Sequence, residues 1–342
     1  MTRGPTVLVV GGYGAVGRVV TRALAGRGVP VVVAGRDPAR ARNLAREHPG
    51  LVTLRAVDVE TADGTLLDGS DVVVMCVERA NARVANLCLT RGVHYVDISA
   101  TATVLDDLER LDPVARRHDA TAVLSVGLAP GLTNVLARRC VDDLRSATGV
   151  EVTVLLGLSG DHGPDSARWT VEQLAAPRRS GEGRRARVTL PGFGARTAHP
   201  FAFSDQHSLT RTLGVPVTTR VCFDSAAATA ALFGLRRAGV FRLGRRLVGT
   251  DRLARTASRL PLGGGDRFVV HVAATDDAGS RVAYAVSGRG ECHATGVVAA
   301  HVVEELLRRN VGSGVRHLDQ VIGAGALLDL LPAHGLTVHA SA

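Results

Sequence analysis

The feature that most constrains the fold is a stretch near the start of the chain, TVLVVGGYGAVGRVVTRALAGR, at residues 6–27. A short apolar run typical of a buried parallel strand leads directly into the pattern G-x-G-x-x-G at residues 12–17. The first glycine permits a tight turn, the second lets main-chain N–H groups approach a pyrophosphate, and the third allows close helix packing. Apolar residues then recur at helical spacing. The stretch therefore predicts a strand, a phosphate-binding turn and a helix whose N-terminus faces the anion.

Composition is that of an ordinary globular protein. The chain has 342 residues, 46% hydrophobic and 21% charged, which is enough for two domains with cores of their own. The net charge is +9, and the positive charge comes entirely from arginine because the sequence contains no lysine. We interpret this charge as spread over many surfaces and, with only 3% aromatic residues, expect no nucleic-acid partner. Mechanisms that use a lysine Schiff base or an ammonium acid are excluded.

The cysteines indicate neither disulfides nor a metal site. They number five, lack the paired spacing of metal ligands and mostly lie among apolar neighbours. We therefore expect reduced thiols and no bound metal. The first strand begins without a signal-peptide pattern, and no apolar run approaches the ~20 residues that span a bilayer. These observations favour a cytoplasmic protein with no membrane partner.

The end of the second predicted strand, Val31–Ala34, indicates which nicotinamide cofactor binds. A carboxylate at this position would favour NAD, whereas the residue here is Arg36, whose guanidinium can pair with a 2′-phosphate. The sequence therefore favours NADP, with NAD remaining possible. In a simpler interpretation, Arg36 is solvated, Asp37 is the N-cap of the next helix and Pro38 occupies its first position. Both interpretations can hold together.

Strands and helices alternate as far as residue 130, which predicts right-handed parallel crossovers. Ligands of such sheets bind beyond the carboxyl ends of the strands. We therefore expect Asp58 and Val59 near the adenine, and Cys76 and Val77 near the centre of the cofactor. A role for Cys76 as a small core residue alone is the simpler alternative.

The pattern changes to period two from about residue 150. The alternation at 150–156 and 217–223 predicts antiparallel strands, and 267–273 and 281–287 predict a hairpin in the same sheet. A clear helical pattern follows, with apolar residues at 299, 302, 303 and 306. The apolar face of this helix should pack against a sheet. We expect an α/β protein with an N-terminal Rossmann doubly wound parallel sheet and an inserted α+β domain containing a largely antiparallel sheet. The expected boundaries are 1–130 for dinucleotide binding, 131–290 for substrate binding and dimerisation, and 291–342 for helices that return to the Rossmann domain.

Residues 225–260 are mostly helix-forming and rich in alanine, leucine and arginine. They could form a dimer face, a substrate lid or a membrane-surface helix. We favour packing or dimerisation, because most of the apolar residues are small alanines. The sequence thus predicts a homodimer.

With these motifs in place, the chain resembles the saccharopine dehydrogenase (saccharopine reductase-like) family over most of its length. The stretches that carry the resemblance are VLVVGGYGAVGRVVTRAL, AVDVET, VVVMCVERANARVANLCLTRGVHYVDIS, VGLAPGLTNVLARR and TGVVAAHVVEELLRR, in this order. The resemblance implies a Rossmann domain that binds NAD(P), an inserted domain that binds the substrate, and hydride transfer at a carbon bonded to nitrogen. It also implies cofactor contacts at Gly12, Tyr13, Gly14, Ala15, Val16, Arg36, Asp58, Val59, Cys76, Val77, Gly127, Ala129 and Pro130.

The chain departs from the family in two places. Residues 99–103 read SATAT where the family often has a glycine or glutamate motif, and the lysine proposed as an acid-base group in related enzymes has no counterpart. Both differences argue against assuming that saccharopine is the substrate.

Three residues are candidate catalytic groups. His162 could donate a proton at neutral pH, Arg168 could hold a substrate carboxylate, and Asp97 could contact the substrate or the nicotinamide. The simpler alternatives are loop solvation or helix capping for the first two and turn capping for Asp97. Asp205 and His207 are weaker candidates, which would share one face if they lay on a strand.

We expect an NADP(H)-dependent oxidoreductase that acts on CH–NH or CH–NH2 groups. The expected reaction reduces an imine formed from an amine and a carbonyl compound, with a small amino-acid-like molecule as substrate. Such a reaction needs the hydride of the cofactor, a positioned carbon and little acid-base help. The alternatives are an NADP(H)-dependent carbonyl reductase and a non-catalytic NADP-binding redox sensor.

Overall fold

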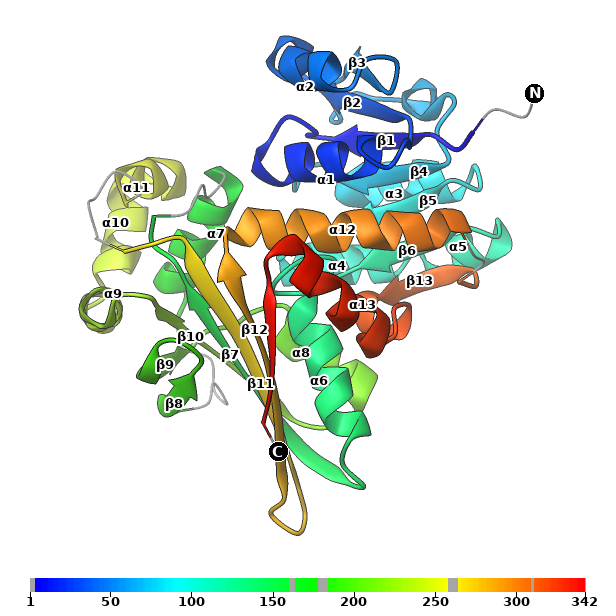
Figure 1. Cartoon of the computed structure of the whole chain (residues 1–342). Helices are drawn as coiled ribbons and strands as arrows, with labels where there is room; N and C mark the ends of the chain where they lie inside the picture. The colour runs from blue at the N-terminus through cyan, green and yellow to red at the C-terminus, as the bar shows by residue number, and fades with distance from the viewer. Residues whose placement is uncertain (1–3, 160–163, 178–183, 258–263, 309–310, 342) are drawn as a thin grey trace. The chain divides into compact units, whose positions relative to one another are not determined.

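The structure is a computed structural model that describes residues 4–159, 164–177, 184–257, 264–308 and 311–341 (Figure 1). It divides into two compact units. The first contains residues 1–135 and 292–327, and the second contains residues 136–291 and 328–342. Each unit is built around its own seven-stranded sheet.

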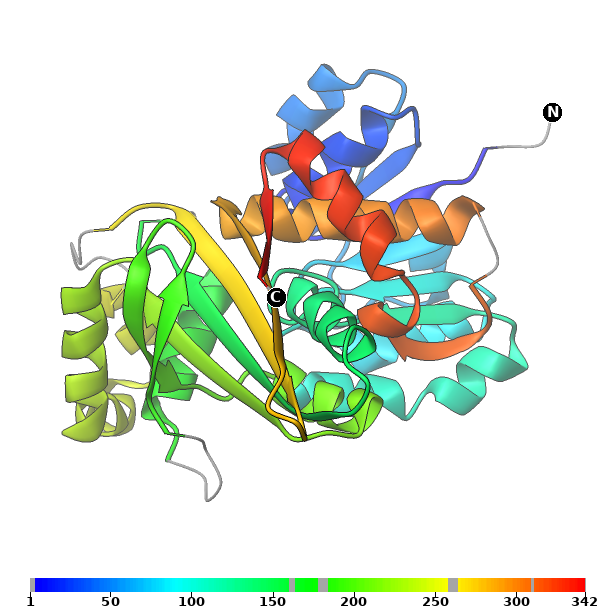
Figure 2. The ribbon, with the colours of Figure 1, turned by 60° about the horizontal axis from the view of Figure 1, so that its bottom comes forward.

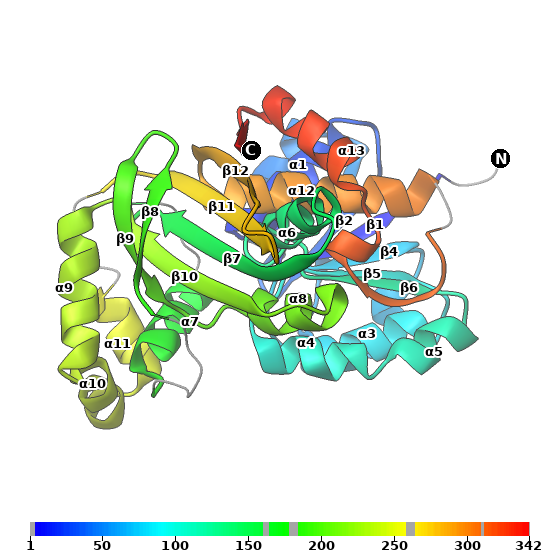
Figure 3. The same cartoon turned by 90° about the horizontal axis from the view of Figure 1, so that it is seen from below.

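The sheet of the first unit has the order β3-β2-β1-β4-β5-β6-β13, and all of its neighbouring strands are parallel. Its strands are β1 (Val7–Val10), β2 (Val31–Gly35), β3 (Val52–Ala56), β4 (Val72–Met75), β5 (His94–Asp97), β6 (Thr121–Leu124) and β13 (Gly314–His317). Its helices are α1 (Ala15–Ala25), α2 (Arg42–Glu47), α3 (Asn81–Leu89), α4 (Ala102–Glu109), α5 (Asp112–Arg117) and α12 (Glu291–Arg308), with short 3-10 helices η1 (Pro38–Ala41), η2 (Gly64–Leu67) and η3 (Leu318–Gln320). Figure 3 shows α3, α4 and α5 on one face of this sheet and α1 and α12 on the other. The predicted doubly wound Rossmann sheet is confirmed.

Glycine permits the close packing of helices against this sheet. Every residue of β1 is buried, as expected for a strand covered on both faces. A Cβ atom at Gly17, in the first turn of α1, would lie 2.3 Å from the carbonyl oxygen of Gly11. A Cβ atom at Gly296 would lie 2.5 Å from the Cβ of Val19, where α12 approaches α1. The predicted helix around residue 299 is confirmed as α12.

The second unit contains a mixed sheet with the order β14-β12-β11-β7-β10-β9-β8, whose green and yellow strands run side by side in Figure 2. Its strands are β7 (Ala147–Leu156), β8 (Ala186–Leu190), β9 (Gly194–Pro200), β10 (Val217–Phe223), β11 (Arg267–Asp276), β12 (Arg281–Arg289) and β14 (Thr337–Ser341). Its helices are α7 (Pro164–Ala175), α8 (Asp205–Leu213), α9 (Ala226–Arg237), α10 (Val240–Val248), α11 (Thr250–Ala257) and η4 (Leu331–His334), while α6 (Leu132–Asp142) and α13 (Ala324–Leu330) each contain residues of both units. The predicted β11–β12 hairpin and the largely antiparallel pairing are confirmed.

Two details of the second unit differ from the sequence-based expectations. Strands β7 and β10 are parallel to each other, because the long connection between them returns the chain in the same direction. Alternation of apolar residues reports which face is buried and carries no information on direction. Asp205 and His207 lie on helix α8, where residues two positions apart point to different sides, so Asp205 is buried and His207 is exposed.

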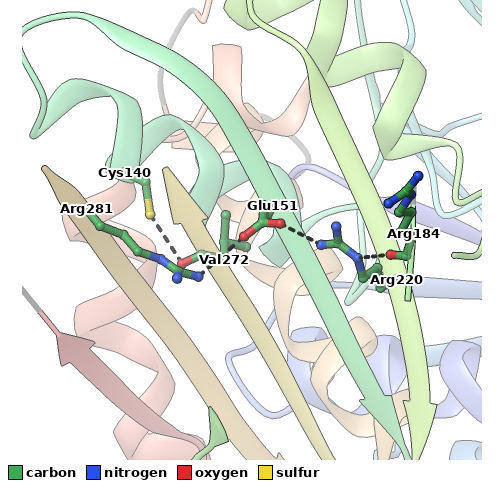
Figure 4. A network of polar contacts seen from close by, with 6 residues as sticks. All are labelled: Cys140, Glu151, Arg184, Arg220, Val272 and Arg281. Carbon is green, nitrogen blue, oxygen red and sulfur yellow. Dashed lines mark hydrogen bonds and ion pairs between the residues drawn. The ribbon is translucent and has the colours of Figure 1, made fainter. Parts of the chain in front are cut away.

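A charged network crosses the sheet of the second unit (Figure 4). Glu151 on β7 accepts a hydrogen bond of 2.9 Å from Arg220 on β10 and one of 3.5 Å from Arg281 on β12. Arg220 is buried and also donates to the carbonyl of Arg184, which gives its guanidinium a second partner. The pairing accounts for a charged side chain inside the sheet.

His94 is a partly buried histidine at the start of β5. Its ring lines a cavity of about 320 Å³ near the start of β5, and its Nδ1 accepts the N–H of Thr121 at 3.1 Å. Burial lowers the pKa of His94 below 6.5, although the nearby carboxylates of Asp119 and Asp71 oppose this shift. The unfolded chain binds the proton more readily, so stability that is present above pH 6.5 is lost as the pH falls below that value.

We expect the free energy of unfolding, measured by urea titration, to fall below pH 6.5 with a slope of up to about 1.4 kcal/mol per pH unit from His94. The variant His94→Asn keeps an acceptor but cannot titrate, so its stability should fall less steeply. Equal slopes in the two proteins would show that His94 does not contribute.

Candidate functional site

The carboxyl ends of the parallel strands bring together several predicted site residues in the first unit. Backbone hydrogen bonds continue beyond the strand ends, from Gly11 N to Ala34 O at 2.8 Å and from Cys76 N to Val10 O at 3.0 Å. A Cβ atom at Gly11 would lie only 2.8 Å from a methyl group of Val77. The glycine turn after β1 therefore lies directly against the turn after β4.

The glycine turn opens onto the N-terminus of α1. Gly14 is the N-cap residue and has an extended backbone, with φ −74° and ψ 178°. Among the described residues, no side chain caps this end and the first turn contains no acidic group. The N–H groups at Ala15 and Val16 belong to the orphan donors of a helix start, which bind anions. The residues predicted to contact the phosphates thus belong to one turn of main chain.

Tyr13 connects this turn to the end of β2. Its ring covers Gly35 so closely that a Cβ atom there would lie 2.5 Å from the ring. Its hydroxyl accepts the N–H of Asp37 at 3.3 Å, and the guanidinium of Arg40 lies 5.0 Å from the ring centroid. The carboxylate of Asp37 accepts the N–H of Ala39 at 3.1 Å and caps η1, as the simpler interpretation of this turn expected.

Two guanidinium groups therefore follow β2, while the one carboxylate nearby is engaged in capping. Arg36 is exposed, and within the described part of the chain it has no hydrogen-bond or ion-pair partner. Arg40 is exposed as well and lies over Tyr13. This arrangement suits a phosphate dianion better than a pair of ribose hydroxyls.

The residues after β3 and β4 are less polar. Asp58 is exposed, and its carboxylate accepts the N–H of Glu60 at 3.0 Å. Val59 is buried, and its carbonyl accepts a hydrogen bond from Arg83. Burial and the charge of Asp97 raise the pKa of the Cys76 thiol to about 12. Cys76 is therefore a neutral thiol at physiological pH and no nucleophile.

Asp97, at the end of β5, is completely buried and accepts three hydrogen bonds. Its Oδ2 atom receives the hydroxyl of Tyr95 at 2.6 Å and the amide of Asn81 at 2.9 Å, and its Oδ1 atom receives the N–H of Ser99 at 2.7 Å. Burial and the adjacent Asp97 raise the pKa of Tyr95 well above 10. These contacts hold the ends of β4 and β5 and favour a positioning role for Asp97.

The turn after β6 is shaped by glycine. Gly131 has φ +138°, and a Cβ atom there would lie 2.0 Å from the carbonyl oxygen of Gly127. Leu128 donates its N–H to the hydroxyl of Thr295 on α12 at 3.2 Å. The predicted residues Gly127, Ala129 and Pro130 thus form a tight, braced turn at the same edge as the glycine turn after β1.

A buried polar chain supports this turn. Ser125 directly follows β6 and has φ +56°, a conformation that residues other than glycine rarely adopt. Its hydroxyl lies 2.8 Å from Nδ1 of His317, and Nε2 of His317 lies 3.0 Å from a carboxylate oxygen of Glu109. The order serine, histidine, carboxylate matches a nucleophilic triad. Because Ser125 is completely buried, its hydroxyl is not accessible to a substrate. We therefore interpret the three linked side chains as a support for the turn after β6.

The other candidate catalytic residues lie on the second unit. His162 falls outside the described residues. Arg168 on α7 is half exposed and pairs with Glu172 at 3.1 Å and with Asp251 at 3.9 Å. Trp169 is partly buried and packs against the rings of Phe201 and Phe203. In the part of the chain that the structure describes, no group of three or more potential ligands could hold a metal ion.

Sequence reasoning missed several residues of the site. Arg40 could have been found, because it lies one helical turn after the Asp37 cap on the same short helix. Asn81 and Glu78 follow β4 and bind the turn after β5, where Glu78 accepts the N–H of Ala100 at 2.7 Å. Their partners are distant in sequence, so spacing alone gave no signal for them.

The first unit fits a dinucleotide. The glycine turn presents main-chain donors where a side chain would block approach, the end of β2 offers Arg36 and Arg40, and the turn after β6 closes the same edge. Along the edge these parts stand in the order β2, β1, β6, which is the order of 2′-phosphate, pyrophosphate and nicotinamide contacts in a Rossmann domain.

Comparison with known proteins agrees with this geometry. Residues 7–141 match the sequence model of the saccharopine dehydrogenase NADP binding domain. This match confirms the resemblance seen in the sequence and identifies NADP as the cofactor of the first unit. No curated protein sequence matches the chain.

Comparison with a solved structure confirms the fold. Apo saccharopine dehydrogenase (L-Glu forming) from Saccharomyces cerevisiae is 15% identical and superimposes with a TM-score of 0.67, over 99% of this chain and 100% of that chain. The WlbA dehydrogenase from Thermus thermophilus, solved with NAD and UDP-GlcNAcA, is 15% identical over 96% of this chain and 94% of that chain, with a TM-score of 0.45. The likeness to the yeast structure shows the fold of the chain.

Proposed function

We propose, since residues 7–141 belong to the saccharopine dehydrogenase NADP-binding domain family, that the chain is an NADP(H)-dependent oxidoreductase acting at a carbon bonded to nitrogen. The observation that carries the proposal is the combination of that domain with an edge built for a phosphorylated dinucleotide. In the direction of reduction, an imine carbon gains a hydride and its nitrogen gains a proton, which gives an amine. NADPH supplies the hydride when bound.

The residues of the chain hold and orient the cofactor. The main-chain N–H groups after Gly14 bind the pyrophosphate, and Arg36 and Arg40 bind the 2′-phosphate. The turn Gly127–Pro130 supports the nicotinamide, and Asp97 fixes the strand end beside it. Neither Cys76 nor Tyr95 exchanges a proton near neutral pH, since both pKa values are raised. An iminium ion is already activated, so orientation is the main contribution of the protein.

His162 and Arg168 remain our proposed substrate-side groups. His162 has a side chain that can give up a proton near neutral pH, and Arg168 can bind a carboxylate. Alanine at either position should lower turnover of an amino-acid-like substrate while NADPH affinity stays unchanged.

The test of the reaction type is oxidation of NADPH in the presence of a panel of amines combined with 2-oxo acids. The proposal predicts that oxidation needs both an amine and a carbonyl compound. Oxidation with the carbonyl compound alone would instead show a carbonyl reductase. Tight NADPH binding without turnover across the whole panel would show a redox sensor.

Arg36 should determine the choice between the two nicotinamide cofactors. Its contact with a 2′-phosphate is charge-assisted and worth about 1.5–3 kcal/mol, so Arg36→Ala should weaken NADPH about 10- to 100-fold. The affinity for NADH, which lacks this phosphate, should change little. Arg42→Ala on α2, an exposed arginine of the same unit, is the matched control and should leave both affinities unchanged. Equal losses for both cofactors in Arg36→Ala contradict the assignment.

A further inference from the structure

Exposed large apolar side chains are concentrated in one short segment of the second unit. The described residues contain six of them, and five lie between residues 235 and 248. Leu247 is 73% exposed and Leu243 is 59% exposed, the highest values of the group. We call the five the α10 patch, which consists of Leu235, Val240, Leu243, Leu247 and Val248. Exposed apolar clusters of this kind often mark interaction surfaces.

Helix α10 explains why the patch is exposed. At 100° per residue, Val240, Leu243 and Leu247 lie along one side of the helix. Phe241 is buried and holds the helix in place, and α10 packs against α7, α9 and α11. Figures 1 and 3 show these four helices grouped together beside the second sheet. Gly244 is covered by Leu253 of α11, so only part of the apolar side of α10 is used within the unit.

The surroundings of the patch are strongly basic. Residues 235–256 contain seven arginines and a single acidic residue, Asp251. Asp251 lies 3.9 Å from Arg168, so its charge is already shared. Arg242, Arg245 and Arg246 are all exposed; at 100° per residue Arg246 lies beside Leu243, whereas Arg242 and Arg245 lie on the other side of α10. A short helix with exposed leucines, a flanking arginine and further arginines on its polar side is typical of helices that lie in the interface of a membrane.

Self-association explains this surface less well. Five side chains that are about half exposed offer on the order of 500 Å², below the ~800 Å² per partner of a standard protein interface. A two-fold contact through the patch would also bring the arginines of both copies together, which costs free energy. An anionic surface, by contrast, attracts each of these arginines while the leucines enter the apolar layer.

We propose that the α10 patch docks the protein onto the surface of an anionic lipid bilayer. Leu243 and Leu247 enter the boundary between headgroups and acyl chains, Arg246 beside Leu243 pairs with lipid phosphates, and the charges of Arg242 and Arg245 add to the attraction. The association is peripheral, because no helix in the described ranges is long and apolar enough to cross a membrane. The alanines of residues 225–260 favour packing or dimerisation, whereas the most exposed apolar residues of the segment are leucines. The predicted homodimer then uses another surface.

Co-sedimentation with vesicles tests the proposal. We expect the wild-type chain to bind vesicles of equal parts phosphatidylcholine and phosphatidylglycerol, and to bind less as salt is raised. The double variant Leu243→Ser/Leu247→Ser should bind at least about tenfold more weakly. Arg245→Gln/Arg246→Gln should also lose about tenfold. All of these side chains are exposed, so the thermal midpoint should stay unchanged.

Two control variants carry the same chemical changes elsewhere. Leu54→Ser removes the sixth exposed apolar side chain, and Arg42→Gln/Arg46→Gln removes two charges from α2. Both should bind vesicles as the wild type does. Absence of wild-type binding, equal binding to pure phosphatidylcholine, or equal losses in the controls overturns the proposal. So does sedimentation showing a wild-type dimer that Leu243→Ser/Leu247→Ser converts to a monomer, since the patch would then be the dimer face.

Discussion

Replacing Gly14 with alanine is expected to abolish most NADPH binding while leaving the protein folded. The added Cβ would meet only the carbonyl oxygen of Gly11, at 3.2 Å, and the backbone of Gly14 suits alanine. It would also stand where the pyrophosphate approaches the start of α1. Loss of those charge-assisted contacts, on the order of 3 kcal/mol, corresponds to about 100-fold weaker binding. Calorimetric titration and thermal melting measure the two effects separately.

Gly17→Ala is the matched control and should show the opposite pattern. Its Cβ would lie 2.3 Å from the Gly11 carbonyl oxygen and 2.6 Å from the Gly12 Cα, both of which are backbone atoms. We expect a loss of stability of roughly 1–3 kcal/mol, because main chain must move to make room. Wild-type affinity for NADPH in Gly14→Ala would contradict the placement of the pyrophosphate.

Asp97→Ala is expected to destabilise the first unit strongly. The substitution removes the acceptor of the Tyr95 hydroxyl and of the Ser99 N–H in a completely buried place, whereas the Asn81 amide keeps the Val77 carbonyl at 3.2 Å and the Ser99 hydroxyl at 3.1 Å. Each unsatisfied buried group costs about 1–3 kcal/mol, so we expect a loss of about 2 kcal/mol or more from these two donors. Urea unfolding of the variant, monitored by circular dichroism, measures it.

Asp58→Ala provides the control at the same edge of the sheet. Its carboxylate is exposed and accepts one backbone N–H, so its loss should cost about 1 kcal/mol or less.

The stability of Asp97→Ala also separates a structural role of Asp97 from a catalytic one. A variant with wild-type stability and no turnover would return Asp97 to the catalytic role suggested by its position in the sequence.

The fold could be predicted because its signals are local. The spacing of Gly12, Gly14 and Gly17 between an apolar run and a helical pattern occurs in few settings other than a Rossmann turn. Alternation of strand and helix then implied a parallel sheet, and the strand ends followed from it. The direction of β7 relative to β10 could not be read, since it depends on a long connection. Asp205 and His207 would share one face on a strand, but they lie on helix α8, which the spacing of two residues does not reveal.

The site could be predicted only where it is made of backbone or of residues at strand ends. Gly14, Arg36 and Gly127 lie at the expected edge because that edge follows from the order of strands. The acceptor role of Asp97 depends on Asn81 and Tyr95, and the pairing of Ser125 with His317 joins residues 192 positions apart. No periodicity encodes such pairs. The exposure of Leu243 and Leu247 was equally unreadable, because an apolar face in a sequence does not reveal whether a neighbour covers it.

The most direct test of the account is a calorimetric titration of the wild-type chain with NADPH, with Gly14→Ala as the reference. The account predicts one saturable site per chain, tighter for NADPH than for NADH, that is nearly lost in the variant. Absence of saturable binding in the wild type, or binding that Gly14→Ala does not change, would contradict the claim that the first unit is a working NADP site.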